Sequence, residues 1–286
     1  YVRSTTLTGY HAGPTDITKT PFTYRQTGLS VGGPIIKNKL FFFLSGEQER
    51  ISAPATSYVA SSGGSTGANV SQADAATLNS ISQYLQTNYG YNPGPYQGYS
   101  YQTHSDKMTV KLDWNIDKNN VWSAKYFYLK SYKDQPASNS GIVGISNTTR
   151  APGVTTLPFY GSGYRINNNF NIGIIELDTR ISSSMSNRLT VGYSALRDYR
   201  ASLGGTAIPL VDIGNGVASA DPVTGIVTET TASAVQTSFG YELYTANNLL
   251  STNIAQFSDD FTIFAGKHEI VIGTSEIGRA SSRARV

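Results

Sequence analysis

Hydrophobic and polar residues alternate along several segments of this chain, with the period of two that is typical of β-strands. In residues 108–116 every even-numbered position is hydrophobic and every odd-numbered position is polar or charged. A polar turn at residues 117–120 follows, and a second strand is expected at residues 121–133. The hydrophobic face of that second strand carries Trp122, Ala124, Tyr126 and Tyr128. Each strand of this predicted hairpin therefore has one apolar and one polar face.

The same unit, two strands joined by a short turn, is expected four times along the chain. The expected strand pairs are 23–35 with 40–50, 108–116 with 121–133, 169–181 with 187–199, and 251–264 with 268–274. Long polar stretches separate these hairpins, at residues 51–105, 134–168 and 200–250. Loops longer than about 12–15 residues are uncommon in compact soluble domains.

Short turns that alternate with long loops are what outer-membrane β-barrels show, with the turns in the periplasm and the loops outside. We therefore predict an all-β chain that forms part of an antiparallel transmembrane β-barrel, with long extracellular loops. The strands of an antiparallel sandwich or a propeller also alternate between hydrophobic and polar residues, so these folds remain the alternative. The aromatic residues expected near strand ends, which suit the interfacial girdles of a barrel, are Trp114, Trp122, Tyr126, Tyr128, Tyr132, Tyr193 and Tyr199.

One expected strand does not alternate cleanly. Its charged residues Glu176 and Asp178 would share a face with hydrophobic residues of the same parity. These hydrophobic residues are Phe170, Ile172 and Ile174. A bulge near Gly173 would remove the conflict, and so would a barrel lumen that contains apolar contacts.

The composition favours strands and turns over helices. Charged residues make up 14% of the chain, compared with roughly 25% in average soluble domains. The 28 Gly and 19 Tyr residues suit turns and strands, so a helical bundle or coiled coil is excluded. No window contains the roughly 18 consecutive apolar residues that a transmembrane helix needs. The absence of Cys removes disulfides and thiolate metal sites.

Both ends of the chain indicate an incomplete sequence. The chain begins at Tyr1 without a leader peptide, and we interpret it as a fragment. After Thr274 the strand pattern breaks, and residues 275–286 resemble the translation of a sequencing-adapter oligonucleotide. We therefore expect the domain to span residues 1–274 and residues 275–286 to be non-native. This tail carries +2 of the formal net charge of +3, so charge gives no reason to expect a nucleic-acid partner.

The titratable residues do not form a pattern that is typical of catalysis. Glu47 and Glu49 share one face of a strand, whereas Asp259 and Asp260 lie on opposite faces. The three His residues are far apart and lack the i, i+4 spacing of a helical metal site. They are His11, His104 and His268. We expect no enzyme activity, no catalytic residue, no metal site and no cofactor.

The first long polar stretch contains one short helix. Leu78, Ile81 and Leu85 form an apolar stripe at i, i+3 and i+7, and Ser71 could cap the helix with Asp74 at the third position. We expect this stripe to pack onto its own loop, and a ligand or partner surface is the alternative.

Tyrosines are dense in the same stretch. Aromatic rings with polar tips suit contacts with a carbohydrate or peptide, and packing within the loop is the alternative. The candidate residues for binding an unknown extracellular ligand are Tyr89, Tyr91, Tyr96 and Tyr99.

Three segments resemble one family of proteins. Residues 29–43, LSVGGPIIKNKLFFF, closely resemble the first full barrel hairpin of Oar-like TonB-dependent outer-membrane receptors of Bacteroidetes-type bacteria. Residues 78–96 resemble the helix and loop that these receptors carry outside that hairpin. Residues 111–116, KLDWNI, are similar to their next strand. The resemblance covers most of residues 1–274 and is weakest at residues 200–250.

The resemblance implies an architecture and a function. Such receptors contain a carboxypeptidase-regulatory-like β-sandwich, a plug domain with a TonB-contacting segment, and a barrel of about 22 strands. This chain would supply about nine of those strands and would include neither the plug nor the TonB-contacting segment. The implied function is energised uptake of a bulky ligand across the bacterial outer membrane. The implied partners are outer-membrane lipid, the TonB system and the extracellular ligand.

Two other functions fit the same pattern. One is an outer-membrane adhesion or surface-organising protein that binds a partner without transport. The other is a secreted β-rich binding module.

Overall fold

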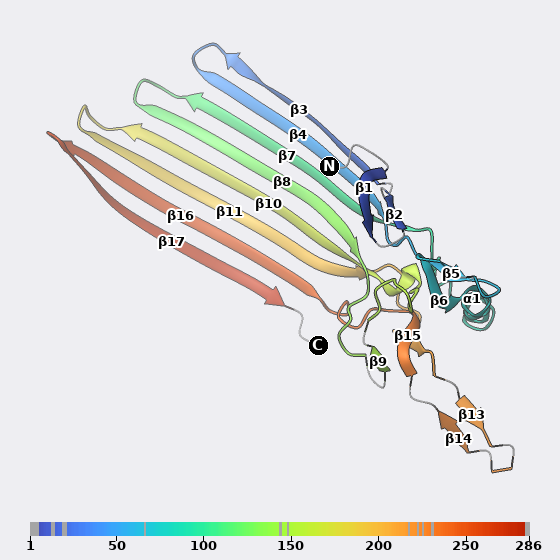
Figure 1. Cartoon of the computed structure of the whole chain (residues 1–286). Coiled ribbons are helices and arrows are strands. Elements are labelled where there is room, and N and C mark those ends of the chain that lie inside the picture. Colours follow the sequence, from blue (N-terminus) through green and yellow to red (C-terminus); the bar gives the residue numbers. More distant parts are fainter. Residues whose placement is uncertain are drawn as a thin grey trace.

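The chain folds into one large antiparallel sheet with an assembly of short elements at one end (Figure 1). A computed structural model describes residues 6–12, 15–18, 22–65, 67–142, 145–147, 149–216, 218–221, 223–224, 226–229 and 232–283. The large sheet has eight strands of 14 to 18 residues. They are β3 (Thr23–Ile36), β4 (Leu40–Pro54), β7 (Ser100–Asn115), β8 (Asn120–Gln135), β10 (Tyr164–Arg180), β11 (Met185–Ser202), β16 (Leu249–Ala265) and β17 (His268–Arg283).

The eight strands follow each other in the sheet in chain order, from β3 at one edge to β17 at the other. The four predicted hairpins are therefore confirmed, and each pairs with the next. Within the described residues β3 and β17 do not pair with each other, so the sheet is open, as expected for part of a barrel. We predicted about nine strands, and the described sheet has eight because β1 (Thr6–Ala12) pairs only with β2 (Thr15–Thr18).

The strands are longer than predicted, because pairing continues for several residues beyond the hydrophobic part of each strand. The long loops are shorter to the same extent. Strand β17 pairs with β16 as far as Arg283, so the predicted break of the strand pattern after Thr274 is wrong. The non-native origin of residues 275–286 remains a prediction.

One face of the sheet, here named the apolar face, carries four successive rows of mainly hydrophobic residues. From the turns toward the loops, the rows are Leu40, Trp114, Trp122, Leu177 and Leu189; Phe42, Leu112, Ala124, Ile175, Val191 and Phe257; Leu44, Val110, Tyr126, Gly173, Tyr193 and Ala255; and Gly46, Met108, Tyr128, Asn171, Ala195 and Asn253. The four rows extend over seven residues, or about 20 Å of strand. A hydrophobic band of this kind lies on the outer face of membrane barrels. Two carboxylates also fall here, Asp259 in the first row and Glu276 in the second.

The predicted aromatic girdles are only partly confirmed. Trp114 and Trp122 pair with each other in the row nearest the turns, and Tyr132 and Tyr199 lie beyond the fourth row. The prediction is wrong for Tyr126 and Tyr193, because their row lies inside the hydrophobic band and not at its edge.

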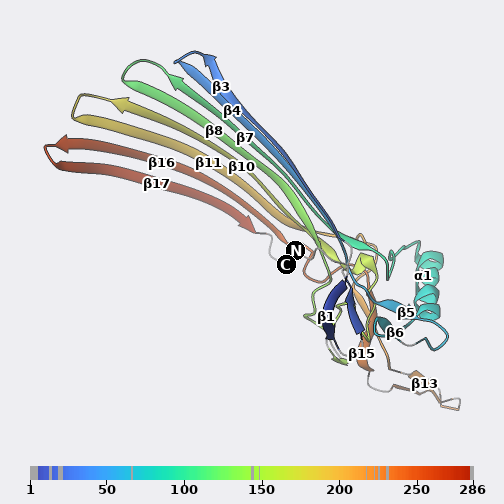
Figure 2. The same cartoon turned by 45° about the horizontal axis from the view of Figure 1, so that its top comes forward.

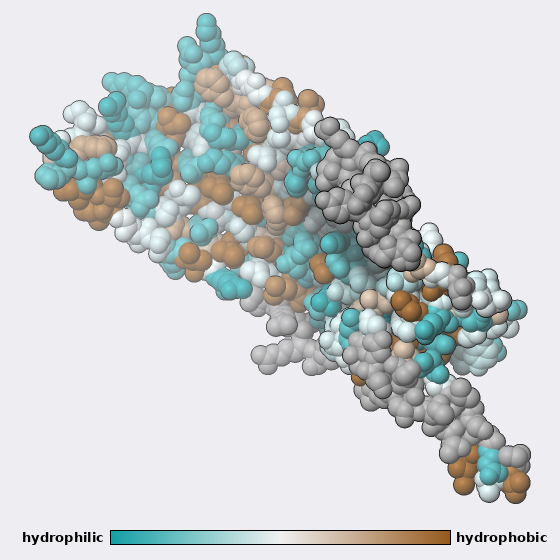
Figure 3. All heavy atoms as spheres, viewed as in Figure 1, coloured by the Kyte–Doolittle hydropathy of each residue, from teal (hydrophilic) through white to brown (hydrophobic). Residues whose placement is uncertain are grey.

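The opposite face, here named the polar face, carries most charges of the strands. They include Glu47, Lys107, Lys111, Asp113, Lys125, Glu176, Asp178, Arg188 and Asp260. The face turned to the viewer in Figure 3 mixes hydrophilic and hydrophobic patches along the strands. The described buried hydrophobic residues lie outside this sheet, so the hydrophobic rows of the sheet are not covered by the described chain.

Short turns close all four hairpins at the same end of the sheet (Figure 2). Two turns use the left-handed region of φ, at Asn38 (φ 61°) and Gly266 (φ 64°). In a third turn the Asp117 carboxylate accepts hydrogen bonds from the backbone N–H groups of Asn119 and Asn120 at 2.7 and 3.0 Å. Local hydrogen bonds and backbone conformations of this kind are what let a short polar turn reverse the chain.

The loop assembly is the group of short elements at the other end of the sheet (Figure 2). It contains β5 (Val59–Ser61), β6 (Val70–Asp74), α1 (Ala75–Tyr89), β9 (Ile145–Asn147), the 3-10 helix η1 (Tyr160–Ser162), β12 (Val211–Gly214) and β15 (Ala232–Phe239). The hairpin of β13 (Ala218–Ala220) and β14 (Val227–Glu229) extends from it (Figure 1). Among the described helices none is long and apolar enough to cross a membrane.

Helix α1 confirms the predicted apolar stripe. Leu78 and Leu85 are buried and Ile81 packs beside them, so the stripe faces the loop assembly as expected. The cap differs from the prediction: Asp74, not Ser71, accepts a hydrogen bond from Thr77 N at 2.8 Å. The reason is that Asp74 directly precedes the first helical residue, Ala75, whereas Ser71 lies three residues earlier and its hydroxyl donates to Val154 O at 3.2 Å.

Candidate functional site: polar face and loop assembly

Ion pairs between neighbouring residues cross the polar face of the sheet. Lys107 Nζ lies 2.5 Å from Glu47 Oε1, and Arg188 Nε lies 2.6 Å from Asp178 Oδ1. Further pairs join Lys111 to Asp113 at 2.8 Å and Lys125 to Glu176. These side chains are largely half-exposed, so each pair adds little to stability. Their shared face shows which side of the sheet is suited to water.

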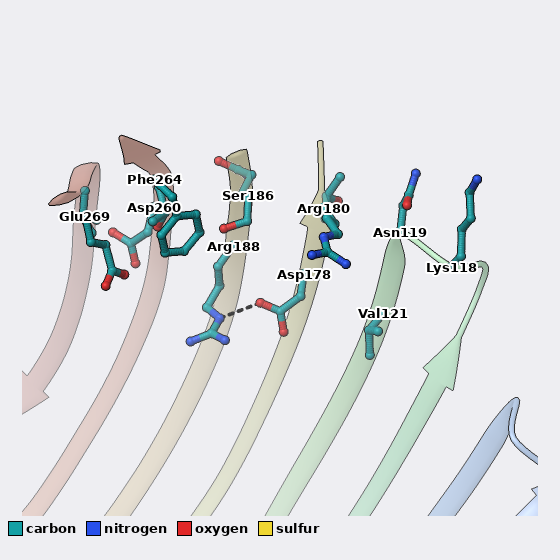
Figure 4. A pocket seen from close by; sticks show the side chains of 14 residues that line it. Lys118, Asn119, Val121, Asp178, Arg180, Ser186, Arg188, Asp260, Phe264 and Glu269 are labelled. Atoms are coloured by element: carbon teal, nitrogen blue, oxygen red, sulfur yellow. Dashed lines mark hydrogen bonds and ion pairs between the residues drawn. The ribbon is translucent and has the colours of Figure 1, made fainter. Parts of the chain in front are cut away.

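A hollow of about 680 Å³ lies on the polar face beside the turns (Figure 4). Strands β8, β10, β11, β16 and β17 line it, and the Arg188–Asp178 pair spans it between β10 and β11. Its other charged residues are Lys118, Arg180, Asp260 and Glu269. With three cations and three carboxylates the hollow is balanced in charge and selects neither anions nor cations.

Hydrophobic residues also lie on the polar face, in the middle of the strands. The register of β10 with both neighbours is continuous from Tyr164 to Thr179, so there is no bulge at Gly173. Of the two explanations for the imperfect alternation, the structure supports apolar residues on the inner wall. This patch consists of Phe127, Leu129, Phe170, Ile172, Leu196 and Ile254.

The four candidate tyrosines do not form one surface. Tyr89 is exposed and its ring stands edge-on to Tyr84, with centroids 5.9 Å apart. Tyr91 and Tyr99 are buried, and the Tyr96 ring packs edge-on against Phe159, with centroids 5.7 Å apart. The alternative of packing within the loop therefore holds for Tyr91 and Tyr99. Only Tyr89 is freely available to a ligand.

Tyr91 shows why this cluster is structural. Its hydroxyl would lie 2.6 Å from a Cβ atom placed on Gly204 and 3.1 Å from one placed on Gly161. Any side chain at Gly204 would therefore clash with it. Burial raises the pKa of the Tyr91 phenol, so this hydroxyl stays neutral at physiological pH.

A buried ion pair joins two of the long loops. Arg150 binds Asp212 through two hydrogen bonds, Nε to Oδ1 and Nη2 to Oδ2, both 2.7 Å long. Its Nη1 also donates to the carbonyl oxygens of Ser138 and Ser140. The Arg150 side chain is 1% exposed and that of Asp212 is 17% exposed. Both residues stand in the polar stretches without a periodic pattern, so the sequence carried no signal for this contact.

Two more charged contacts lie where the sheet meets the loops. Asp134, fully buried, accepts from Arg165 Nε at 2.7 Å and from Gln102 N at 3.1 Å. Glu242 is also fully buried and lies 3.9 Å from Arg200. The first contact joins the loop ends of β7, β8 and β10, and the second joins the third long loop to β11.

The described residues contain no group of three or more His, Asp or Glu that could hold a metal ion. Asp259 and Asp260 point to opposite faces of β16, as predicted: Asp259 accepts from Asn187 at 2.6 Å, and Asp260 pairs in register with Arg188. The lack of enzyme activity remains an expectation.

Comparisons with known proteins relate this chain to proteins of the outer membrane. The profile of the family described as "Outer membrane beta barrel domain" matches residues 1–282. The chain is also similar in structure to the outer membrane transporter YddB from Escherichia coli, with a TM-score of 0.50 and 14% sequence identity. That similarity covers 93% of this chain but only 27% of the transporter, so the chain spans about a quarter of that protein's length. No curated protein matches the sequence.

Proposed function

Because this chain belongs to the family of outer membrane β-barrel domains, we propose that it is part of the barrel of a TonB-dependent receptor that imports a bulky ligand. The bacterial outer membrane is its location. A secreted binding module is thereby excluded, and adhesion without transport remains the competing function.

The observation that carries this proposal is the division of the sheet into two faces. The apolar face carries a continuous hydrophobic band that suits lipid, and the polar face carries ion pairs and a hollow that suit the water-filled interior of a closed barrel. A closed barrel with this wall surrounds a water-accessible passage. Passage of a ligand is the function that such an interior serves, whereas an adhesin needs only the loops.

The large size of the barrel supports import of a bulky ligand. Eight adjacent strands remain an open sheet, although eight strands suffice to close a small barrel. The full barrel is therefore wider than an eight-stranded one, and the interior grows with strand number. Energy coupling through TonB rests on the resemblance of residues 29–43, 78–96 and 111–116 to Oar-like receptors.

Uptake from a defined mixture tests the proposal. Wild-type cells, cells lacking this gene and cells lacking TonB receive a tryptic digest of casein together with a mixture of oligosaccharides. Mass spectrometry then measures which components disappear from the medium. We expect at least one component that only the wild type removes. If cells without TonB remove every component as fast as the wild type, energised import is contradicted, and surface binding that needs only this gene supports adhesion.

A further inference from the structure

The apolar face contains a groove of about 420 Å³ in the middle of its band. Its floor is Gly173, where an added Cβ atom would meet nothing within 4 Å. Tyr126 and Tyr193 flank this glycine in the same row, on the two neighbouring strands. The other hydrophobic side chains of the apolar face that line the groove are Val110, Leu112, Ala124, Ile175 and Val191. The groove thus exists because one strand lacks a side chain between two large rings.

One wall of the groove is held in place. The Tyr126 hydroxyl donates to Asn171 Oδ1 at 2.6 Å, which directs the ring along the strand toward the loop end of the sheet. Tyr193 stands on the other side and is 52% exposed. Because the apolar face contacts the hydrocarbon of the membrane, a groove in it is open to lipid chains.

Two cations lie beyond the groove on the same face. Asn169 pairs in register with Lys130 on β8 and Arg197 on β11, just as Gly173 pairs with the two tyrosines. The two rows are four residues apart, or about 13 Å along the strand. With a strand tilt of about 40° this corresponds to about 10 Å along the membrane normal, whereas half of the hydrocarbon core is about 15 Å. The long Lys and Arg side chains can extend over the remaining distance, so their charges reach the lipid headgroups when the groove lies near the middle of the bilayer.

Neither cation is neutralised by a described carboxylate within 4.0 Å. Asp106 lies opposite Lys130, but its Oδ1 is bound by Arg50 at 2.6 Å and by Gln48 at 3.1 Å. Arg197 donates from Nη1 to the carbonyl oxygen of Leu196, at 2.7 Å, and from Nη2 to Asn253 at 2.8 Å. Uncharged partners hold this guanidinium in place and leave its charge available.

We propose that this face binds a phosphorylated glycolipid of the outer leaflet, with its phosphate at Lys130 and Arg197 and one acyl chain in the groove over Gly173. The assignment to the outer leaflet follows from the position of the cations on the loop side of the band, because the loops of outer-membrane barrels are extracellular. Arg and Lys are the residues that bind phosphate oxygens through charge-assisted hydrogen bonds. The proposal depends on the location of the barrel and not on transport.

Binding of defined lipids to the full-length protein in detergent tests this site. The probes are hexa-acylated monophosphorylated lipid A, its dephosphorylated form, and phosphatidylglycerol, each measured by native mass spectrometry. We expect the wild-type protein to bind the phosphorylated lipid A at least about tenfold more tightly than the dephosphorylated form, since charged hydrogen bonds are lost. Equal binding of the two forms, or equal binding of phosphatidylglycerol and lipid A, would overturn the proposal.

Variants locate the site. K130Q/R197Q should lose about tenfold in affinity for phosphorylated lipid A, and G173L should weaken its binding because the added side chain fills the groove. The matched controls are K133Q, a cation of the same strand on the polar face, and G46L, a glycine of the apolar face outside the groove. Heat-modifiable migration confirms folding of every variant. The assignment would be contradicted if the control variants lost as much affinity for phosphorylated lipid A as the site variants. It would also be contradicted if K130Q/R197Q lost no affinity.

Discussion

At the scale of single residues, the side chains of each strand alternate between the apolar and the polar face of the sheet. Val110 and Leu112 pair with residues of the apolar face, whereas Lys111 and Asp113 form an ion pair on the polar face. This was predictable because the side chains of a strand that separates lipid from water alternate between the two sides. The Arg150–Asp212 pair was not predictable, because it joins residues 62 positions apart in segments without a period.

The first prediction concerns the apolar face. Leu112 lies in the second of its four rows, so L112R should destabilise the folded barrel by about 2–4 kcal/mol, the cost of Arg near the bilayer midplane. The control K111R changes a neighbouring residue on the polar face and should have little effect. Urea titrations of the full-length protein in lipid vesicles measure both. If L112R lowers the free energy of unfolding by no more than K111R does, Leu112 does not face lipid.

The second prediction concerns the buried pair in the loops. R150M should destabilise the loop assembly by about 3–5 kcal/mol, because it leaves the Asp212 carboxylate without its partner. The double variant R150M/D212L should destabilise the loop assembly less than R150M, because it leaves no unpaired carboxylate. As a control, R188M removes one partner of an exposed pair and should cost about 0–1 kcal/mol. Hydrogen exchange of residues 211–214 measures local opening, and equal effects of R150M and R188M would contradict the account.

At the scale of elements, the pattern predicted which segments are strands better than where they end. The hydrophobic stripe of α1 was clear from its spacing, but two residues suited to capping preceded it. Only Asp74 directly precedes the first helical residue, and the exact start of a helix is hard to predict from spacing. Of the four candidate tyrosines only Tyr89 remained exposed, because Tyr91 and Tyr99 fill the core of the loop assembly. Density of aromatic residues does not distinguish a core from a binding surface.

The third prediction is the pH dependence of α1. The backbone N–H of Thr77, which donates to the Asp74 carboxylate, lowers the pKa of that group. Because the folded pKa is below the unfolded one, the cap is fully present above the unfolded pKa of about 4 and is lost as the pH falls through the folded value. Pepsin should therefore cleave within residues 75–89 faster at pH 3 than at pH 5.

The variant D74N provides the control, since Asn caps helices about as well as Asp and does not titrate. Cleavage of α1 in D74N should change less between the two pH values than in the wild type. An identical increase in both proteins would assign the effect to other groups.

At the scale of the whole molecule, the sheet is the wall of a larger barrel. Its edges β3 and β17 remain unpaired within the described chain, and unpaired edges are not tolerated in lipid. The open sheet therefore requires further strands to complete a barrel. The order of the strands could be predicted from the sequence because each strand of the sheet pairs only with the strands that precede and follow it in the chain order of the sheet. The fold of the loop assembly could not, because its contacts join three separate loops.

The fourth prediction concerns orientation. An epitope inserted at Gly64, in the first long loop, should be detected by antibody on intact cells. One inserted at Asn119, in the turn between β7 and β8, should be detected only after permeabilisation. Detection of both epitopes on intact cells would contradict the placement of the turns in the periplasm.

We expect one face of this sheet to contact lipid and the other to face a water-accessible interior. Single cysteines placed at residues 108–113 of the full-length protein in its membrane test it most directly. A membrane-phase thiol reagent should react with the cysteines that replace Met108, Val110 and Leu112. A small aqueous reagent should react with those that replace Thr109, Lys111 and Asp113. Labelling that is reversed, or that does not alternate along β7, would contradict the account.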